Sequence, residues 1–336
     1  MMQMMDLDAV TSGNRLALSR LLTEVENDTE SGRAALDRLF AKSGSAHLVG
    51  ITGSPGTGKS SLVSCLAKYI RTEVGNSVAV VAIDPSSPFT GGAILGDRVR
   101  MRDLAGDPGV FIRSMASRGA LGGLARATAG VVQVLDAAGF DIILIETVGA
   151  GQSEVDIARL AHTTIVIEAP GFGDDIQAIK AGILEIADIL VINKADLPGA
   201  DSTERALRAN LDLGYSPRML HNSAHMTADG KEGDPDLHGW VPPVLKTIAT
   251  QNSGIAEVLA SIQSHRDYLH KTGLWQQRDR ERLRAEGAQL LQATLVQRWQ
   301  KNVPPDKHEA VLERVFTREI SPAAAIGALV DDCNHL

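Results

Sequence analysis

The sequence predicts an α/β fold, a doubly wound and mainly parallel sheet that carries helical extensions at its N- and C-terminal ends. Two observations predict it. Short runs rich in Val and Ile recur from residue 47 onward, and segments of helical periodicity separate several of them. Successive apolar positions indicate strands buried on both faces, and such strands joined through helices form parallel sheets. Before and after this region only helical spacing is found.

The N-terminal helical extension is expected over residues 1–45, where leucines such as Leu18, Leu21 and Leu22 recur at helical spacing. The central α/β domain follows at residues 46–262. Its predicted strands, in chain order, are HLVGIT (47–52), SVAVVAID (77–84), VFIRS (110–114), DIILIET (141–147), TTIVIEA (163–169), DILVINKAD (188–196) and a last strand within WVPPVLKTIAT (240–250).

A C-terminal helical segment is expected over residues 263–336. Leucines from Leu283 onward and Trp299 lie near helical spacing, and the prolines of VPP at 303–305 end that helix. Ser321 then offers an N-cap, with Pro322 at the first position of a further helix. This tail is small for a core of its own, so we expect an antiparallel helical appendage that forms a homodimer. Packing on the same subunit is the alternative.

The composition argues against several classes of protein. A net charge of −8 disfavours general nucleic-acid binding, because phosphate contacts need clustered Lys and Arg. The two cysteines, Cys65 and Cys333, cannot build a disulfide framework or a cysteine-rich metal site. No apolar run approaches the ~20 residues of a membrane span, and the first residues lack the pattern of a secretory signal. We therefore expect a cytoplasmic protein that binds neither nucleic acid nor membrane.

A phosphate-binding loop is predicted where GITGSPGTGKSS separates a strand from a helix. The stretch fits the pattern GxxxxGK[ST], in which glycines let backbone N–H groups turn toward phosphate oxygens at a helix N-terminus. Lys59 can then reach the β- and γ-phosphates, and the Ser60 hydroxyl can ligate Mg²⁺. An ordinary glycine-rich turn is the alternative. The predicted P-loop comprises Gly53, Ser54, Pro55, Gly56, Thr57, Gly58, Lys59, Ser60 and Ser61.

The motif NKAD follows a predicted strand, at the place where P-loop GTPases recognise guanine. The Asp196 carboxylate can accept from the guanine N1–H and the exocyclic amine, which adenine does not offer as a pair. Lys194 can lie along the base, and Asn193 can tie this loop to the P-loop. The motif therefore favours GTP over ATP, and Ala249 of KTIAT is assigned to the remaining base loop.

Three carboxylates are candidate ligands for Mg²⁺ together with Ser60. Asp84 ends a predicted strand, Asp97 lies in the loop GGAILGDR, and Glu146 ends DIILI. Strand ends on the phosphate side suit such residues to hold the ion directly or through water. Any of them could instead cap a helix. We assign catalytic roles to Lys59, Glu146 and Asp84.

Gln152 lies three residues after Gly149, whereas the water-positioning residue of small GTPases follows that glycine directly. We therefore interpret Gln152 as a residue of a switch region. No arginine finger can be assigned within the chain, so we expect slow unaided hydrolysis that rises when a partner orders the switches.

Several of these stretches together resemble the MeaB/ArgK group of P-loop GTPases: GITGSPGTGKSSL, AIDPSSPFTGGAILGDRVRM, GGLARAT, AAGFDIILIETVGAGQSE, GDDIQAIKAGILEIADILVINKAD and WVPPVLKT. Members of this group are G-protein chaperones of adenosylcobalamin-dependent acyl-CoA mutases. The resemblance covers about residues 10–330. It implies a GTPase domain over 46–262 and a C-terminal dimerisation segment. It also implies a role in gating cobalamin delivery to methylmalonyl-CoA mutase, or a relative such as a hydroxyacyl-CoA mutase, and in protecting or reactivating it.

The resemblance also implies residue roles. It places Lys59 and Ser60 on the phosphates and the metal ion. It places Asp84, Asp97 and Glu146 around Mg²⁺. It places Asn193, Lys194 and Asp196 on the guanine base. It makes GFGDDIQAIK, with Asp174, Asp175 and Lys180, an extra switch that reports the nucleotide state to the mutase. On the sequence alone, Lys180 would be an exposed helix lysine. The implied cofactors are GTP or GDP with Mg²⁺, and adenosylcobalamin only through the partner mutase.

Three other functions stay open at this stage. A nickel or zinc metallochaperone GTPase would carry a cysteine motif or a His-rich tail, whereas Cys65 stands alone and His221, His225 and His238 are scattered in a polar loop. A kinase acting on a transport protein would need an acceptor site and a catalytic base, which no motif after the P-loop supplies. A nucleotide-dependent scaffold without hydrolysis is the third.

Overall fold

The computed structural model describes residues 6–84, 104, 106–116, 123–147, 153–171, 185–214, 239–302 and 305–331. The chain forms two compact units, Met1–Arg282 and Leu283–Leu336. The predicted division of the first unit at residues 45 and 262 stays a prediction.

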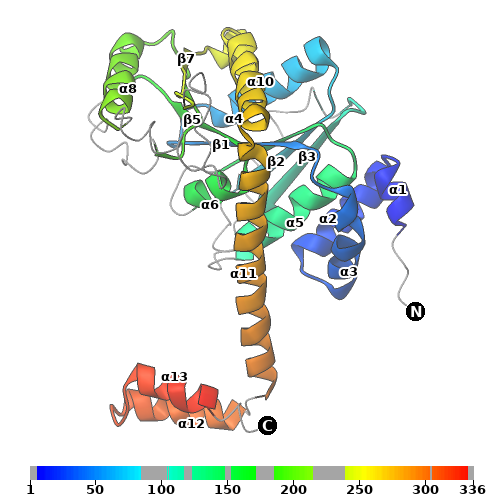
Figure 1. The fold of residues 1–336 in the computed structure, drawn as a ribbon, viewed down its shortest axis with the longest axis vertical. Helices are drawn as coiled ribbons and strands as arrows, with labels where there is room; N and C mark the ends of the chain where they lie inside the picture. The colour runs from blue at the N-terminus through cyan, green and yellow to red at the C-terminus, as the bar shows by residue number, and fades with distance from the viewer. Residues whose placement is uncertain are drawn as a thin grey trace, which may run out of the picture. The chain divides into compact units, whose positions relative to one another are not determined.

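The first unit is built on a seven-stranded sheet in which every pairing is parallel (Figure 1). The strand order is β3-β2-β4-β1-β5-β6-β7. The strands are β1 (His47–Gly53), β2 (Val78–Asp84), β3 (Val110–Ala116), β4 (Ile142–Glu146), β5 (Thr163–Glu168), β6 (Ile189–Ile192) and β7 (Val244–Lys246). The predicted parallel sheet is confirmed, and each predicted strand is present.

Helices cover both faces of this sheet (Figure 1). Alternate residues of β1 point to opposite faces of the sheet. Leu48 packs among α1, α2, α3, α5 and α6 on one face, whereas Val49 and Ile51 pack against α4 and α10 on the other. A further cluster lies between β6 and α8. These helices are α1 (Leu7–Thr11), α2 (Arg15–Glu26), α3 (Glu30–Leu39), α4 (Lys59–Tyr69), α5 (Gly123–Ala137), α6 (Ser153–Leu160), α8 (Ala200–Gly214) and α10 (Ile255–Thr272).

The N-terminal helices are joined to the sheet by polar contacts as well as by leucines. Arg113 of edge strand β3 pairs with Glu26 of α2, and both side chains are largely buried. The chain then enters β1 past Asp136 of α5, whose carboxylate accepts the backbone N–H groups of Gly44 at 2.6 Å and Ala46 at 3.0 Å. These bonds satisfy backbone donors where the chain passes from helix into the buried strand.

Three buried histidines lie at the amino edge of the sheet, opposite the carboxyl ends of the strands. The Thr163 hydroxyl lies 2.8 Å from His47 Nε2 and 2.9 Å from His265 Nδ1, so one threonine joins β1, β5 and α10. Burial lowers the pKa of His47 well below its ordinary value and the pKa of His265 to about 4. Burial also lowers the pKa of His162, against the raising effect of Asp279. The neutral imidazole is therefore the form that this edge accommodates.

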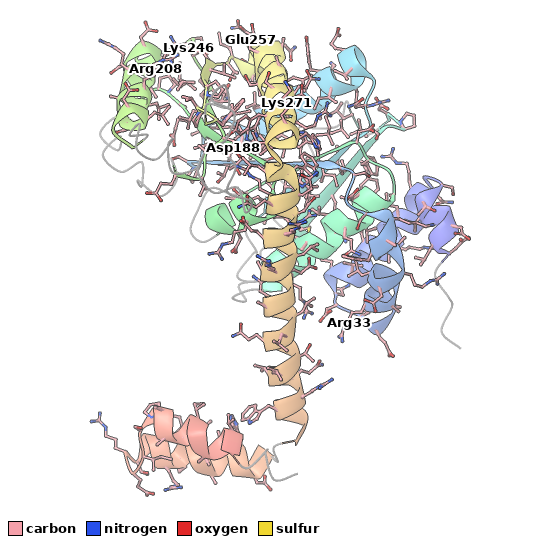
Figure 2. The ribbon with its side chains drawn as sticks, viewed as in Figure 1. Arg33, Asp188, Arg208, Lys246, Glu257 and Lys271 are labelled. Atoms are coloured by element: carbon pink, nitrogen blue, oxygen red, sulfur yellow. The ribbon has the colours of Figure 1, made fainter. Side chains whose placement is uncertain are left out.

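The start of α11 (Leu274–Asn302) packs on the same histidines. Trp275 stacks on His162 with ring centroids 3.8 Å apart and on His270 at 4.4 Å. Asp188, labelled in Figure 2, accepts two hydrogen bonds from the Arg278 guanidinium, at 2.9 and 3.0 Å. Ring stacking and this bidentate pair join the first turns of α11 to the sheet.

The second unit contains the rest of α11, with α12 (Pro305–Phe316) and α13 (Pro322–Asp331). Its small core gathers Val311, Ala325 and Leu329, and Trp299 Nε1 donates to the Leu329 carbonyl at 3.1 Å. As predicted, α11 ends before the prolines and α13 begins at Pro322 behind the Ser321 cap. In the part of the chain that the structure describes, every helix is too short or too polar to cross a bilayer.

Candidate nucleotide site

The predicted P-loop connects the carboxyl end of β1 to the start of α4, in the middle of the sheet. Gly53, Gly56 and Gly58 have φ angles of 138°, 82° and 90°, which residues with a Cβ rarely adopt. A Cβ on Gly53 would lie 2.0 Å from the Ile167 carbonyl oxygen, and one on Gly58 would lie 2.4 Å from Asn193 Nδ2. Besides its conformation, Gly53 is therefore required by the close approach of the β5 backbone, and Gly58 by the close approach of the Asn193 side-chain amide.

Lys59 is the first residue of α4, and its side chain folds back into the loop. Its Nζ donates to the Gly53 carbonyl at 2.8 Å and to the Ser54 carbonyl at 3.0 Å, and the residue is buried. Gly58 precedes it as an N-cap that makes no side-chain hydrogen bond to the helix end. A buried ammonium group beside the N–H groups of a first helical turn forms an anion-binding arrangement.

Ser60 and Glu146 come together from different elements. Ser60 Oγ, in the first turn of α4, donates to Glu146 Oε1, at the end of β4, over 2.6 Å. The carboxylate is buried, with 4% of the residue exposed. Hydroxyl and carboxylate oxygens are the hard donors that Mg²⁺ prefers, so this pair fits the predicted ion. The structure thus brings together two of the four residues predicted around the metal.

Of the other two predicted Mg²⁺ ligands, Asp84 and Asp97, the structure describes only the backbone position of Asp84. Asp84 ends β2, the strand that pairs with β4, and its position lies two residues beyond the pairing of Ala82 with Glu146. Its side chain, and all of Asp97, lie outside the described residues. The predicted switch residues Gln152, Asp174, Asp175 and Lys180 also lie outside them.

Asn193 connects the NKAD loop to two other loops. Its Nδ2 donates to the Thr57 carbonyl of the P-loop at 2.9 Å. Its Oδ1 accepts from Thr247 Oγ1 at 3.1 Å and from the Ala249 backbone N–H at 3.2 Å. The three segments predicted to surround phosphate and base are therefore held together by one buried amide.

Lys194 and Asp196 lie on the solvent side of that amide. Lys194 has a φ of 57°, and its Nζ donates to the Gly56 carbonyl at 2.7 Å, so its side chain runs along the P-loop. Asp196 is exposed. An exposed carboxylate can accept from the edge of a planar base, and the alkyl stem of a lysine can pack on its face.

Three contacts of the site have no counterpart in the sequence motifs. Thr247 donates to Asn193, as described above, and Cys65 Sγ of α4 donates to the Ala249 carbonyl at 3.0 Å. Thr147 donates to Thr52 next to the P-loop. No spacing rule marks these residues, because the two members of each contact lie far apart in the sequence.

Within the described residues, no group of three or more His, Cys, Asp or Glu side chains could hold a metal ion. The phosphate loop, its lysine and serine, and the asparagine-bridged NKAD loop together define a P-loop protein of the GTPase class. This class is recognised by the site rather than by the fold alone.

Comparison with known proteins narrows the class to a family. The family described as "Methylmalonyl Co-A mutase-associated GTPase MeaB" matches residues 18–304. A relative from Pyrococcus abyssi, named as a GTPase, is 44% identical over 327 residues, which cover 97% of this chain and 95% of the relative. GTPase ArgK of Escherichia coli is 37% identical over 269 residues, which cover 79% of this chain and 76% of that relative. The chain belongs to the MeaB family of GTPases, as the sequence motifs predicted.

The fold agrees with this membership. The crystal structure described as LAO/AO transport system kinase superimposes with a TM-score of 0.65 at 26% identity. The match covers 98% of this chain and 96% of that chain. The predicted fold class, an α/β sheet of the P-loop GTPase type, is thereby confirmed.

Proposed function

We propose that this chain is a GTP-hydrolysing chaperone of a cobalamin-dependent acyl-CoA mutase, methylmalonyl-CoA mutase or a close relative. The observation that carries the proposal is the match of residues 18–304 to the mutase-associated GTPase family. In this role the chain gates adenosylcobalamin delivery to the mutase and protects or reactivates it, in the cytoplasm. Cobalamin is then a ligand of the partner and does not bind at the site described above.

The geometry supports a division of tasks within the site. The P-loop and Lys59 hold the phosphates, and the Asp196 carboxylate selects guanine while Asn193 and Ala249 shape the base loop. Ser60 and Glu146 hold Mg²⁺, which supplies charge neutralisation at the phosphates when bound. Asp84 and Asp97 complete its surroundings in this proposal. Hydrolysis is slow without the partner.

Coupling to the mutase is assigned to the switch segments. Gln152, Asp174, Asp175 and Lys180 are proposed to respond to the nucleotide and to contact the partner. The nucleotide controls the complex only if GTP and GDP forms differ in affinity for the mutase, since equal binding shifts no equilibrium. The dissociation constants of the mutase complex with the GTP form and with the GDP form must therefore differ.

A homodimer is proposed through the C-terminal segment. Beyond Arg282, α11 leaves large apolar side chains exposed, among them Leu291 at 61% and Leu295 at 55%. These two leucines lie four residues apart and so share one face of the helix. An exposed apolar face of this kind is typical of a surface that a second helix covers.

The experiment measures binding of the chain to a purified methylmalonyl-CoA mutase by calorimetry, with GDP and with a non-hydrolysable GTP analogue. We expect the two dissociation constants to differ by about tenfold or more, a coupling of about 1.4 kcal/mol. Lys59→Ala should abolish the difference between the two dissociation constants. Lys68 is an exposed lysine of the same helix, and Lys68→Ala should retain the difference. Equal constants for the two nucleotides, together with GTP turnover that the mutase leaves unchanged, would contradict the chaperone role.

A further inference from the structure

The chain leaves β4 immediately beside the P-loop. Glu146, the last residue of β4, is paired with Ile51 of β1 in the sheet. The next residue, Thr147, extends this ladder, because its backbone N–H donates to the Ile51 carbonyl at 3.1 Å. The backbone on either side of the Glu146 carboxylate is thus fixed to the strand that leads into the P-loop.

A side-chain bond reinforces this backbone contact. Thr147 Oγ1 donates to Thr52 Oγ1 at 3.0 Å, and the two residues are 1% and 0% exposed. Thr52 is the residue before Gly53, and Thr147 is the residue after Glu146. One hydroxyl pair therefore joins the position preceding the P-loop to the position following the carboxylate.

Packing alone does not require these hydroxyls. Valine has nearly the same shape as threonine and the same branching at Cβ, which already restricts χ1. A buried hydroxyl is costly unless it is hydrogen-bonded, so two of them in contact form a directional constraint that two methyl groups would not supply. The constraint acts where the Glu146 carboxylate must meet Ser60 Oγ at 2.6 Å.

We propose that Thr147 is a positioning residue for the divalent cation: its bond to Thr52 holds the Glu146 carboxylate against Ser60 and thereby sets the affinity of the nucleotide complex for Mg²⁺. The inference rests on the proposed function of the site. Thr147 does not touch the ion or the nucleotide in this proposal; it acts through Glu146. Residues that orient a metal ligand through a hydrogen bond commonly change metal affinity when they are replaced.

The test measures release of a fluorescent GDP analogue, once with excess Mg²⁺ and once with EDTA. The release rate in EDTA divided by the release rate in Mg²⁺ reports how strongly the ion holds the nucleotide, without reference to turnover. We expect Thr147→Val to reduce this ratio by about tenfold, the lower end of the loss in metal affinity seen when a group that orients a metal ligand is replaced, with the EDTA rate little changed. Thr147→Ser, which keeps the hydroxyl, should restore the ratio to near the wild-type value.

Two further variants separate positioning from loss of fold. Thr52→Val removes the same bond from its other end, so it should lower the ratio alone and add little when combined with Thr147→Val. Thr164→Val, at a buried threonine of β5 near the amino edge, is the matched control and should leave the ratio unchanged. If Thr147→Val does not fold, Thr52→Val carries the test.

The inference is overturned if Thr147→Val and Thr52→Val leave the ratio at the wild-type value, or if they speed release equally with and without Mg²⁺. It is also overturned if Thr164→Val lowers the ratio as much. The wild-type chain tests the proposed function separately. A wild-type chain that binds no GDP, or whose release Mg²⁺ does not slow, contradicts the proposed site itself.

Discussion

Asn193 Nδ2 donates to the Thr57 carbonyl oxygen over 2.9 Å, so the NKAD loop and the P-loop share a buried amide. The same side chain accepts from Thr247 and Ala249 through its oxygen. Donor and acceptor ends of one residue thus hold different loops. This division allows the two ends to be tested separately.

Asn193→Asp keeps an acceptor for Thr247 and Ala249 but loses the donor to Thr57. We expect weaker GDP binding and a loss of stability of about 1–3 kcal/mol, because the Thr57 carbonyl then faces a carboxylate. Asn193→Ala removes both ends and should cost more. Calorimetry with GDP and urea unfolding measure the two quantities. Unchanged GDP affinity in both variants would show that this bridge does not shape the site.

Asp196→Asn should change the preferred base. In guanine, N1–H and the exocyclic amine both donate to a carboxylate; xanthine has a carbonyl in place of that amine. The asparagine amide can accept from N1–H and donate to this carbonyl, so we expect XDP to bind better than GDP. A site that recognises a base by hydrogen bonds binds a base with mismatched groups much more weakly, so the affinity of the variant for GDP should fall by at least about 100-fold. Calorimetry with GDP, XDP and ADP measures it, and an unaltered preference for GDP would refute the role of Asp196.

Gly53→Ala should destabilise the chain far more than Gly75→Ala. Both positions have positive φ, 138° and 81°, so both substitutions introduce backbone strain. Only the Cβ at Gly53 meets another atom, the Ile167 carbonyl oxygen at 2.0 Å, whereas nothing lies within 4 Å at Gly75. We expect about 1–2 kcal/mol for Gly75→Ala from strain alone and a clearly larger loss for Gly53→Ala. Urea unfolding of both variants is the measurement, and equal losses would show that the clash is relieved by relaxation.

The sequence predicted the sheet and the phosphate loop because both carry local signals. A run such as HLVGIT is apolar at successive positions, and the glycine spacing from Gly53 to Gly58 fits one loop geometry. The strand order carries no such signal. It places β1 beside β5, so His47 meets Thr163 across 116 residues of sequence. The Thr52–Thr147 and Cys65–Ala249 contacts were missed for the same reason.

The buried histidines predict acid sensitivity. The pKa of His265 is lowered from 6.5 to about 4 by burial, so between these values the unfolded chain binds a proton that the folded chain excludes. Stability from this residue is fully present above pH 6.5 and is lost as the pH falls toward 4. A shift of this size corresponds to a loss on the order of 3 kcal/mol. His47 and His162 are shifted in the same direction and add to the effect.

Urea unfolding of the wild type and of His265→Gln between pH 7.5 and 4.5 checks this. The glutamine variant should be less stable at pH 7.5, because its side chain replaces a buried ring, but its stability should fall less steeply with acid. His270→Gln is the comparison, because His270 is an exposed histidine of the same helix, α10. Parallel pH curves for wild type and His265→Gln would contradict a buried neutral imidazole at this position.

Replacement of Leu291 and Leu295 by Glu should separate the proposed homodimer. Both side chains are exposed in the isolated subunit, at 61% and 55%, and neither belongs to the small core around Trp299. Two carboxylates on this face would have to be desolvated in a helix–helix interface, which is strongly unfavourable. Sedimentation velocity should show a dimer for the wild type and for Gln297→Glu, an exposed position on another side of α11. A monomeric wild type, or a double variant that stays dimeric, would place the subunit interface elsewhere or remove it.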